Sequence, residues 1–169
     1  LWSTSELNAI GIYEVVTDSS NFKDEAYYIN TNEEYNFADN QATRSWGTAT
    51  PKRLEDENAV DENGDPVLDD DGVQLINYGL KTDKKRIIKQ QASGLLEKTD
   101  WHNHKAFDDE TYTIPNNIKT YRANVRSKSN EMETQIDACT TVQELETLYT
   151  YTTTDGVQSR PLAEFPEEI

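Results

Sequence analysis

The first third of the chain consists of short β-prone runs separated by polar turns. Residues 12–16 and 27–29 are rich in β-branched and aromatic side chains. Residues 35–37 place two aromatic side chains around a polar one, a pattern typical of a half-buried strand, and a further strand is expected around Trp46. We therefore predict a small antiparallel β-meander over residues 12–50.

The periodicity changes to that of an α-helix at Leu80. Apolar residues recur one helical turn apart through residues 87–96, which predicts a first long helix. Pro115 suits the first turn of a second helix, because its missing N–H costs nothing there. Ser129 and Lys128 interrupt the apolar stripe of this helix, so its middle is expected to be less buried. The stripe consists of Ile118, Tyr121, Val125, Met132, Ile136 and Cys139.

Short polar motifs mark the starts of helices. Residues 3–6 and residues 141–144 each form a Ser/Thr-x-x-Glu capping box, which predicts a short N-terminal helix and a last C-terminal one. Thr82 or Asp83 is expected to cap the helix that follows Leu80. The C-terminal half is therefore predicted to be a helical hairpin or bundle of about three helices.

These patterns predict an α+β fold in four segments. They are a helix with a β-meander (1–54), an acidic loop or hairpin (55–78), a helical domain (79–150) and an extended C-terminal segment (151–169). Prolines keep the last segment extended. No internal repeat and no sustained heptad pattern is evident.

Charge is strongly negative and unevenly distributed. The chain has 169 residues and a formal net charge of -16. Residues 55–72 carry nine acidic residues and no Lys or Arg, whereas residues 79–128 carry eleven Lys or Arg against six acidic residues. This favours electrostatic complementarity within the chain over a separate acidic partner. An acidic surface repels phosphate backbones and anionic lipid, so we expect neither nucleic acid nor membrane as a partner.

Tryptophan and cysteine are interpreted as core residues. Trp2, Trp46 and Trp101 are expected to fill the core of a chain that is poor in apolar residues, although Trp is also enriched at interfaces. Cys139 is the only cysteine, so no disulfide forms within the chain. It follows an apolar helical face and is expected to be a buried, inert thiol.

Metal binding is a minor alternative. His102 and His104 would lie on one face of a locally extended chain, at a spacing that suits a transition metal, with Asp100, Asp108 or Asp109 as a further ligand. A closed site needs three or four convergent ligands, so a polar turn beside the neighbouring tryptophan is the favoured interpretation.

A calcium loop is matched only in part. Asp61, Asn63 and Asp65 fit its first three ligand positions, but Pro66 and Gly72 stand where the loop needs its Gly and its bidentate Glu. A solvated acidic hairpin is favoured over weak calcium binding. No catalytic or cofactor-binding motif is present, and we expect neither an enzyme nor a cofactor.

Two arginines extend a polar face beside the apolar stripe. Arg122 and Arg126 lie one helical turn apart, which is compatible with a clamp on a carboxylate of a partner. Internal ion pairs, for example from Arg122 to Asp100, are the favoured interpretation.

Two stretches resemble small bacteriophage tail proteins of the tail-fibre accessory and tail assembly chaperone-like group. One is Leu95–Arg126, with Thr-Asp-Trp at 99–101, Tyr-Arg at 121–122 and Val-Arg at 125–126, and the other is Trp2–Ile12. The β-rich N-terminal part and the acidic hairpin depart from the chaperone-like pattern. These departures favour a virion component over a small assembly chaperone.

The resemblance implies a non-enzymatic structural protein of the tail or tail fibre, made in the host cytoplasm and incorporated into the virion. Its expected partners are other virion proteins and further copies of itself. The residues expected to carry interaction are Trp101, Tyr121, Arg122 and Arg126. An assembly chaperone absent from the mature virion and a receptor- or glycan-binding module remain alternatives.

Overall fold

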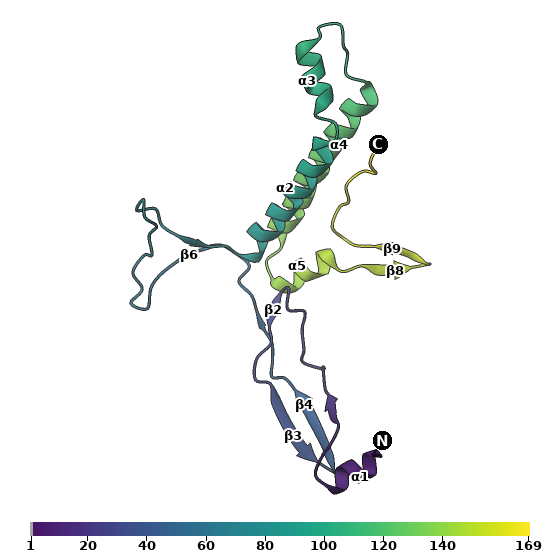
Figure 1. The fold of residues 1–169 in the computed structure, drawn as a ribbon. Helices are drawn as coiled ribbons and strands as arrows, with labels where there is room; N and C mark the ends of the chain where they lie inside the picture. Colours follow the sequence, from purple (N-terminus) through teal and green to yellow (C-terminus); the bar gives the residue numbers. More distant parts are fainter. Residues whose placement is uncertain (1) are drawn as a thin grey trace. The chain divides into compact units, whose positions relative to one another are not determined.

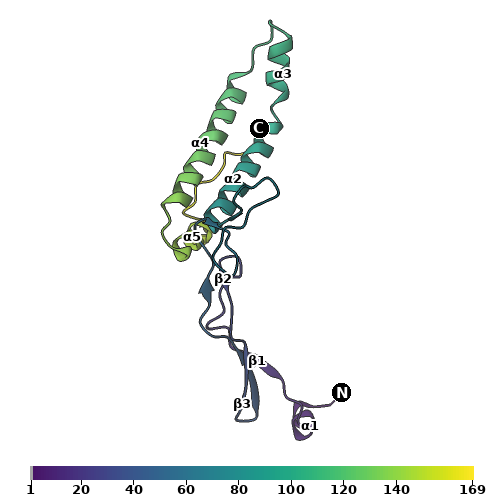
Figure 2. The same cartoon turned by 90° about the vertical axis from the view of Figure 1, so that its left-hand side faces the viewer.

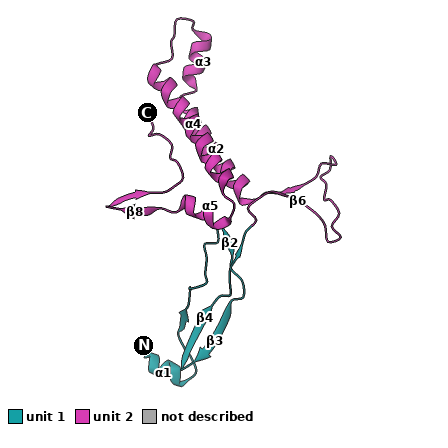
Figure 3. Ribbon diagram, turned by 180° about the vertical axis from the view of Figure 1, so that it is seen from behind, with its two compact units in different colours: residues 1–52 teal, residues 53–169 magenta. Residues whose placement is uncertain are grey.

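The computed structural model describes residues 2–169. It divides into two compact units, residues 1–52 and residues 53–169, which are coloured separately in Figure 3. The fold is α+β, as predicted, with short strands in the first unit and long helices in the second (Figure 1).

Residues 2–52 of the first unit form one short helix and five short strands. Helix α1 (Thr4–Ala9) starts at the predicted capping box, in which Ser3 and Glu6 bond each other's backbone N–H groups. The strands are β1 (Val15–Thr17), β2 (Tyr28–Ile29), β3 (Glu34–Ala38), β4 (Gln41–Ser45) and β5 (Thr50–Pro51).

A three-stranded sheet in the order β1-β4-β3 is the main element of this unit. Strands β3 and β4 form the expected antiparallel hairpin, and its turn residues Asp39 and Asn40 both have positive φ. The meander prediction is wrong for β1, which pairs parallel with β4. Strands β2 and β5 form a separate antiparallel pair.

The second unit is built on two long antiparallel helices that lie side by side in both views (Figures 1 and 2). Helix α2 (Leu80–Glu97) is followed by the short α3 (Trp101–Asp108), and α4 (Asn116–Ala138) runs back beside α2. Pro115 precedes α4 at its N-cap. Helix α5 (Val142–Tyr149) starts at the predicted capping box of Thr141 and Glu144.

The start of α2 is capped by residues far away in the sequence. Gly79 is its N-cap and has no side chain to offer, so the prediction of Thr82 or Asp83 as the cap is wrong. The N–H groups of Leu80 and Lys81 instead donate to the backbone carbonyls of residues 53 and 54. These are two of the donors that a helix start leaves without an intrahelical partner.

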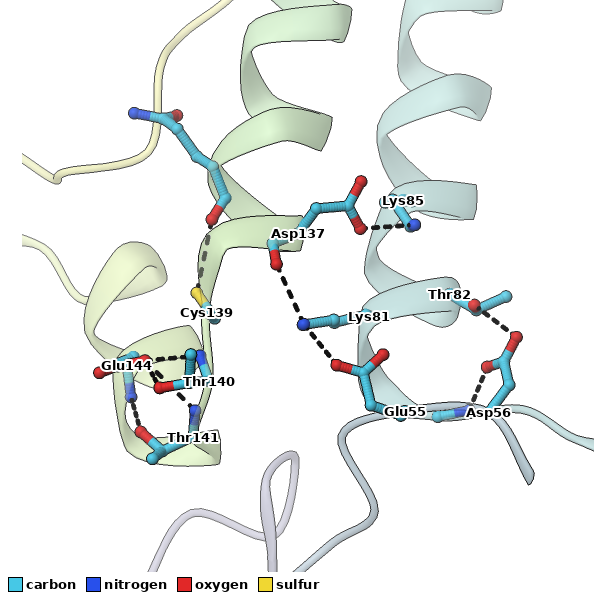
Figure 4. Close-up of polar contacts among 12 residues, drawn as sticks. Glu55, Asp56, Lys81, Thr82, Lys85, Asp137, Cys139, Thr140, Thr141 and Glu144 are labelled. Carbon is cyan, nitrogen blue, oxygen red and sulfur yellow. Dashed lines mark hydrogen bonds and ion pairs between the residues drawn. The ribbon is translucent and has the colours of Figure 1, made fainter.

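Asp56 completes this cap with its carboxylate. Gly79 N–H donates to Oδ1 at 2.8 Å and the Thr82 hydroxyl donates to Oδ2 at 2.9 Å (Figure 4). The first of these bonds is the main cause of a lowered pKa of Asp56. A Cβ atom at residue 79 would lie 2.4 Å from the carbonyl of Glu55, so this close approach requires glycine.

The core of the second unit lies between α2, α4, α5 and the C-terminal segment. Its fully buried side chains are Ile88, Val125, Met132, Ile136, Leu145 and Leu162. The predicted stripe of α4 therefore faces the core. The middle of the stripe was expected to be less buried, but this is wrong at Ser129, whose small side chain is only 7% exposed.

An acidic arm, residues 57–77, projects from the start of α2 (Figure 1). Its base is the antiparallel pair of β6 (Glu57–Asn58) and β7 (Ile76–Asn77). Beyond the base, backbone bonds link Val67 to Ala59, Leu75 to Val67 and Ala59 to Leu75 in a closed ring. The arm is therefore a three-way junction with two turns, not a simple hairpin.

The chain ends in a hairpin and an extended segment. Strands β8 (Thr152–Thr154) and β9 (Val157–Ser159) form the hairpin around the turn at Asp155 and Gly156. Residues 160–168, here named the strap, contain no helix or strand, as expected from the prolines. Both views show the strap running back along the long helices (Figures 1 and 2).

Candidate interaction surface

Arg122 is part of an internal network at the helix junction. From α4 its guanidinium donates to Leu96 O at 2.8 Å, to Thr99 Oγ1 at 2.7 Å and to Asp100 Oδ1 at 2.7 Å. Leu96 is at the end of α2, where carbonyl groups lack intrahelical partners. The prediction of an internal pair with Asp100 is confirmed, and the buried Arg122 directs its guanidinium to three acceptors inside the unit.

Tyr121 also lies inside the unit. It forms a buried cluster with Ala92 of α2 and Val125 of α4, and this cluster also contacts Leu95 and Phe165. Of the four residues expected to carry interaction, Tyr121 and Arg122 therefore stabilise the fold. As interaction residues they are corrected to core residues, since their apolar and charged surfaces are already covered.

Trp101 and Arg126, the other two expected interaction residues, are exposed. Trp101 is 53% exposed and stacks on the neighbouring His102 ring, with 3.7 Å between centroids. The expectation that Trp101 fills the core is wrong, and it is also wrong for Trp2, which is more exposed still. Phe107, which also lies on α3, is 89% exposed. The tip of the helical hairpin therefore presents aromatic surface.

The metal alternative at His102 and His104 required an extended chain, but both residues lie on helix α3. Two positions apart on a helix, their side chains leave opposite faces. His102 is buried, and its Nδ1 shares a hydrogen bond with the Tyr112 hydroxyl. Within residues 2–169, no group of three or more His, Cys, Asp or Glu is placed to hold a metal ion.

The acidic arm contains a repeated turn that the sequence reading missed. The carboxylate of Asp61 accepts the N–H groups of residues 63 and 65, and that of Asp69 accepts those of residues 71 and 73. Gly64 and Gly72 occupy equivalent positions with positive φ. The signal was an Asp-x-x-Gly motif repeated after eight residues.

These turns also bear on the calcium alternative. The backbone N–H of Asp65, followed by that of Asn63, donates to the Asp61 carboxylate and lowers its pKa. This carboxylate oxygen therefore serves the turn itself. In the second turn Asp69 uses one carboxylate oxygen in the same way. The repeat is explained as backbone structure without any ion.

A cluster of polar contacts fixes the start of α2 to the end of α4 (Figure 4). The buried Lys81 ammonium donates to Glu55 and to Asp137 O, and Lys85 pairs with the Asp137 carboxylate at 2.7 Å. Hydrogen bonding to Asp137 raises the pKa of Lys85. Nearby Cys139 is buried, and burial raises the pKa of its thiol, as expected for an inert cysteine.

The sheet of the first unit exposes apolar side chains. Pairing register places Val15, Ala42 and Phe37 in one cross-strand row, with Tyr35 and Arg44 in the next row on the same face. Phe37, Tyr35 and Val15 are all at least 46% exposed. The ring of Tyr13 packs on Phe37 at 4.5 Å between centroids. We name the face formed by these rows the sheet face.

Both outer strands of this sheet have a free edge. Among the strands of residues 2–169, β3 pairs only with one edge of β4 and β1 pairs only with the opposite edge of β4. All residues of β3 and β1 are exposed. A free edge offers unpaired backbone N–H and C=O groups to another strand, so the sheet face and its edges form the main candidate interaction surface.

No family model, curated protein or solved structure matches the chain. None of the helices within residues 2–169 has both the length and the apolar composition needed to cross a membrane. The function is therefore inferred from the residues and their contacts.

Proposed function

We propose that this chain is a non-enzymatic structural protein of a bacteriophage tail or tail-fibre apparatus. It acts through contacts with further copies of itself and with other virion proteins. The resemblance of Leu95–Arg126 and Trp2–Ile12 to phage tail proteins supports the setting. The observation that carries the proposal is the amount of surface that the chain leaves without cover, which includes many large apolar side chains.

The accessible surface of the chain is 12007 Å². Two separate compact domains of 52 and 117 residues would together expose roughly 10,000 Å². The excess of roughly 2,000 Å² is as large as the whole surface buried in a standard protein–protein interface.

The shortage of core is greatest in the first unit. Among its described residues, the buried hydrophobic ones are Tyr27 and Tyr28. The sheet face is exposed, and a small sheet with both faces in water is marginally stable. A structural role explains this composition, because an assembly supplies the missing cover when copies or neighbouring proteins meet.

The second unit supports the same proposal because, unlike the first, it is well packed. Its helices have a continuous buried core, and its buried cations, Arg122 and Lys81, both form ion pairs inside the unit. Neither Lys81 nor Cys139 is arranged as a nucleophile, because the ammonium is bonded to Glu55 and the thiol is buried with a raised pKa. This unit provides a rigid element for an assembly.

The setting is tested by mass spectrometry of purified particles of the phage that encodes the chain. We expect the protein in mature virions at a fixed ratio to the major tail proteins. Detection in infected cells but not in particles would favour the assembly chaperone. Specific loss of cell adsorption after Trp46→Ala, with the fold intact, would favour receptor binding.

The role of the sheet face is tested by sedimentation of the purified chain. We expect a defined oligomer that Phe37→Ser shifts towards monomer. Phe107→Ser is the matched control, because this side chain is equally apolar and more exposed but lies on α3. A chain that is monomeric at all concentrations and absent from particles would contradict the proposal.

A further inference from the structure

The strap is held along the second unit like a bound peptide. Leu162 is 1% exposed and its N–H donates to the carbonyl of Leu148, at the end of α5, at 3.0 Å. Three residues later, Phe165 packs against the buried cluster of Ala92, Tyr121 and Val125, as Leu95 also does. Two apolar anchors from an extended segment thus fill a groove on the helices.

Gln135 of α4 binds the backbone of the strap at both ends of its amide. Its Nε2 donates to Pro161 O at 3.1 Å, and its Oε1 accepts the N–H of Ala163 at 2.8 Å. An amide that bonds the C=O and N–H flanking one residue holds an extended main chain regardless of side chains. The residue between them, Leu162, is the buried anchor, so backbone contacts give affinity and anchors give specificity.

Charge contributes at the far end of the strap. Lys98 at the end of α2 pairs with Glu168 at 2.5 Å. The strap also carries Glu164 and Glu167, whereas α2 is rich in Lys and Arg. We name the surface formed by Leu95, Lys98, Gln135 and Leu148 the strap groove. It fits an extended acidic segment of the form Leu-x-x-Phe.

The linker that joins the strap to helix α5, residues 150–159, does not contribute to the core. Every residue from Thr150 to Ser159 is exposed, including both strands of the β8–β9 hairpin. Detaching the strap therefore uncovers the groove but leaves α2 and α4 packed through Ile88, Val125 and Ile136.

We infer that the strap groove is a docking site for an extended Leu-x-x-Phe segment, and that a second copy of this chain supplies its own residues 160–168 to it in trans. The contacts are identical whether the segment comes from the same copy or from another one. This inference rests on the proposed function, since exchange of straps would link neighbouring copies in an assembly.

Concentration decides between the two arrangements. A short tether holds the segment near its own groove at an effective concentration of about a millimolar. In dilute solution each strap therefore occupies its own groove. In an ordered assembly, neighbouring copies reach comparable local concentrations, and exchange links them without any new contact.

The groove is tested first with a labelled peptide of residues 158–169 and the full chain carrying Leu162→Ala and Phe165→Ala, which loosens its own strap. We expect this host to bind the peptide at least about tenfold more tightly than the wild-type chain, whose groove is occupied. Adding Gln135→Ala to the host should weaken binding, whereas the neighbouring exposed Thr134→Ala should not. Equal binding of the wild-type peptide and of a peptide with both anchors changed to alanine would overturn the inference.

A second host covers the case in which the double variant does not fold. A protease site in the exposed turn at Asp155 and Gly156 allows the folded full chain to be cut, which leaves the strap bound only by its contacts. The labelled peptide should then replace the cut fragment. Failure to exchange at a peptide concentration of about a millimolar, the effective concentration of the tether, would also overturn the inference.

Exchange between copies is tested by mixing two full chains. One carries Leu162→Ala and Phe165→Ala and lacks a competent strap, and the other carries Gln135→Ala and Lys98→Glu and lacks a competent groove. Both chains also carry Phe37→Ser, which removes association through the sheet face, and we then expect a complex of the two in sedimentation that neither chain forms alone. Absence of this complex at concentrations that saturate peptide binding would refute exchange in trans. Because these readouts use purified chains, their failure is separate from absence of the protein in virions.

Discussion

Arg122 gives the sharpest test of how the helix junction is held. Replacing it by alanine removes three hydrogen bonds from a charged donor, to Leu96 O, Thr99 Oγ1 and Asp100 Oδ1. At about 1 kcal/mol each in net terms, they contribute about 3 kcal/mol. Burial of the aliphatic part of the side chain adds about 1 kcal/mol.

Two features of the site reduce this sum. The Asp100 side chain is 46% exposed, so water can solvate its carboxylate once the pair is broken. The Thr99 hydroxyl still donates to Leu96 O, which leaves that carbonyl with a partner. We therefore expect Arg122→Ala to lower the free energy of unfolding by about 3 kcal/mol.

The assay is urea unfolding followed by circular dichroism at 222 nm, which reports the helices of the second unit. With a slope of about 1.5 kcal/mol per molar urea, the midpoint should fall by about 2 M without a change in slope. The midpoint of Arg122→Lys should lie between those of the wild type and Arg122→Ala, because one ammonium group cannot reproduce the planar set of donors of a guanidinium.

Arg126→Ala is the matched control. Arg126 lies one turn further along α4, is exposed, and has one long bond to the carbonyl of Arg122, at 3.4 Å. Its removal should change the midpoint by less than about 0.3 M. If Arg122→Ala and Arg126→Ala gave the same midpoint, the junction would not be held by this network and the reasoning would be refuted.

Three further outcomes are expected. Gly79→Ala should destabilise the second unit by about 3 kcal/mol, because the added Cβ would meet the backbone of residue 55. Gly94→Ala, with open space around residue 94, should instead stabilise α2 by about 1 kcal/mol. Equal urea midpoints for the two variants would contradict this. The pKa of Glu144 is lowered, mainly because its carboxylate accepts the backbone N–H of Thr140. The stability that Glu144 gives α5 is therefore present above its unfolded pKa and is lost as pH falls through its lower folded pKa. With Glu144→Gln, the free energy of unfolding should fall less steeply as pH is lowered. Replacing residues 59–75 by a short turn should leave the urea midpoint of the helices unchanged, and a lower midpoint would show that the arm supports them.

Features of the fold that depend on local sequence were predictable. Both capping boxes use side chains three residues apart, and the stripe of α4 follows helical spacing, so each could be identified within a short window. The turn at Asp39 and Asn40 has the same local origin. These elements are stabilised mainly by neighbours in sequence, which is why a single sequence reveals them.

Features that depend on distant partners were not predictable. The cap of α2 comes from residues 53–56, so the local candidates Thr82 and Asp83 were misleading. The parallel pairing of β1 with β4 joins strands about 27 residues apart, and pattern alone gives no register. Ser129 is buried because neighbouring elements cover it, although its polarity suggested exposure.

The residues expected to carry interaction show the same difference between local pattern and tertiary contact. Arg122 and Tyr121 stand out in the sequence because they are spaced on one helical face, but the same spacing directs them into the helix junction. The sheet face was not identified as a surface, because alternation in β3 normally indicates one buried side. Exposure of Phe37 and Tyr35 can be recognised only once the fold shows that more than half of each residue stays uncovered.

The acidic arm adds a constraint on any assembly. Complementarity within the chain is confirmed at Glu55, which pairs with Lys81. The six acidic side chains between residues 61 and 71, in contrast, form no ion pair with any Lys or Arg among the residues described. Lys85 and Lys89 of α2 pair instead with Asp137 and Glu133 of α4, and Lys98 at the end of α2 pairs with Glu168 of the strap.

Uncompensated charge on the arm acts against association of like copies. In an oligomer formed through the sheet face, arms of neighbouring copies repel one another unless they are held further apart than about 8–10 Å, the screening length near physiological ionic strength. Salt should therefore strengthen self-association, the opposite of its effect on an interface held by ion pairs. A basic partner bound to the arms would have the same effect as salt, because it would neutralise the same charges. If salt weakened self-association of the purified chain, ion pairs rather than the apolar sheet face would hold the copies together.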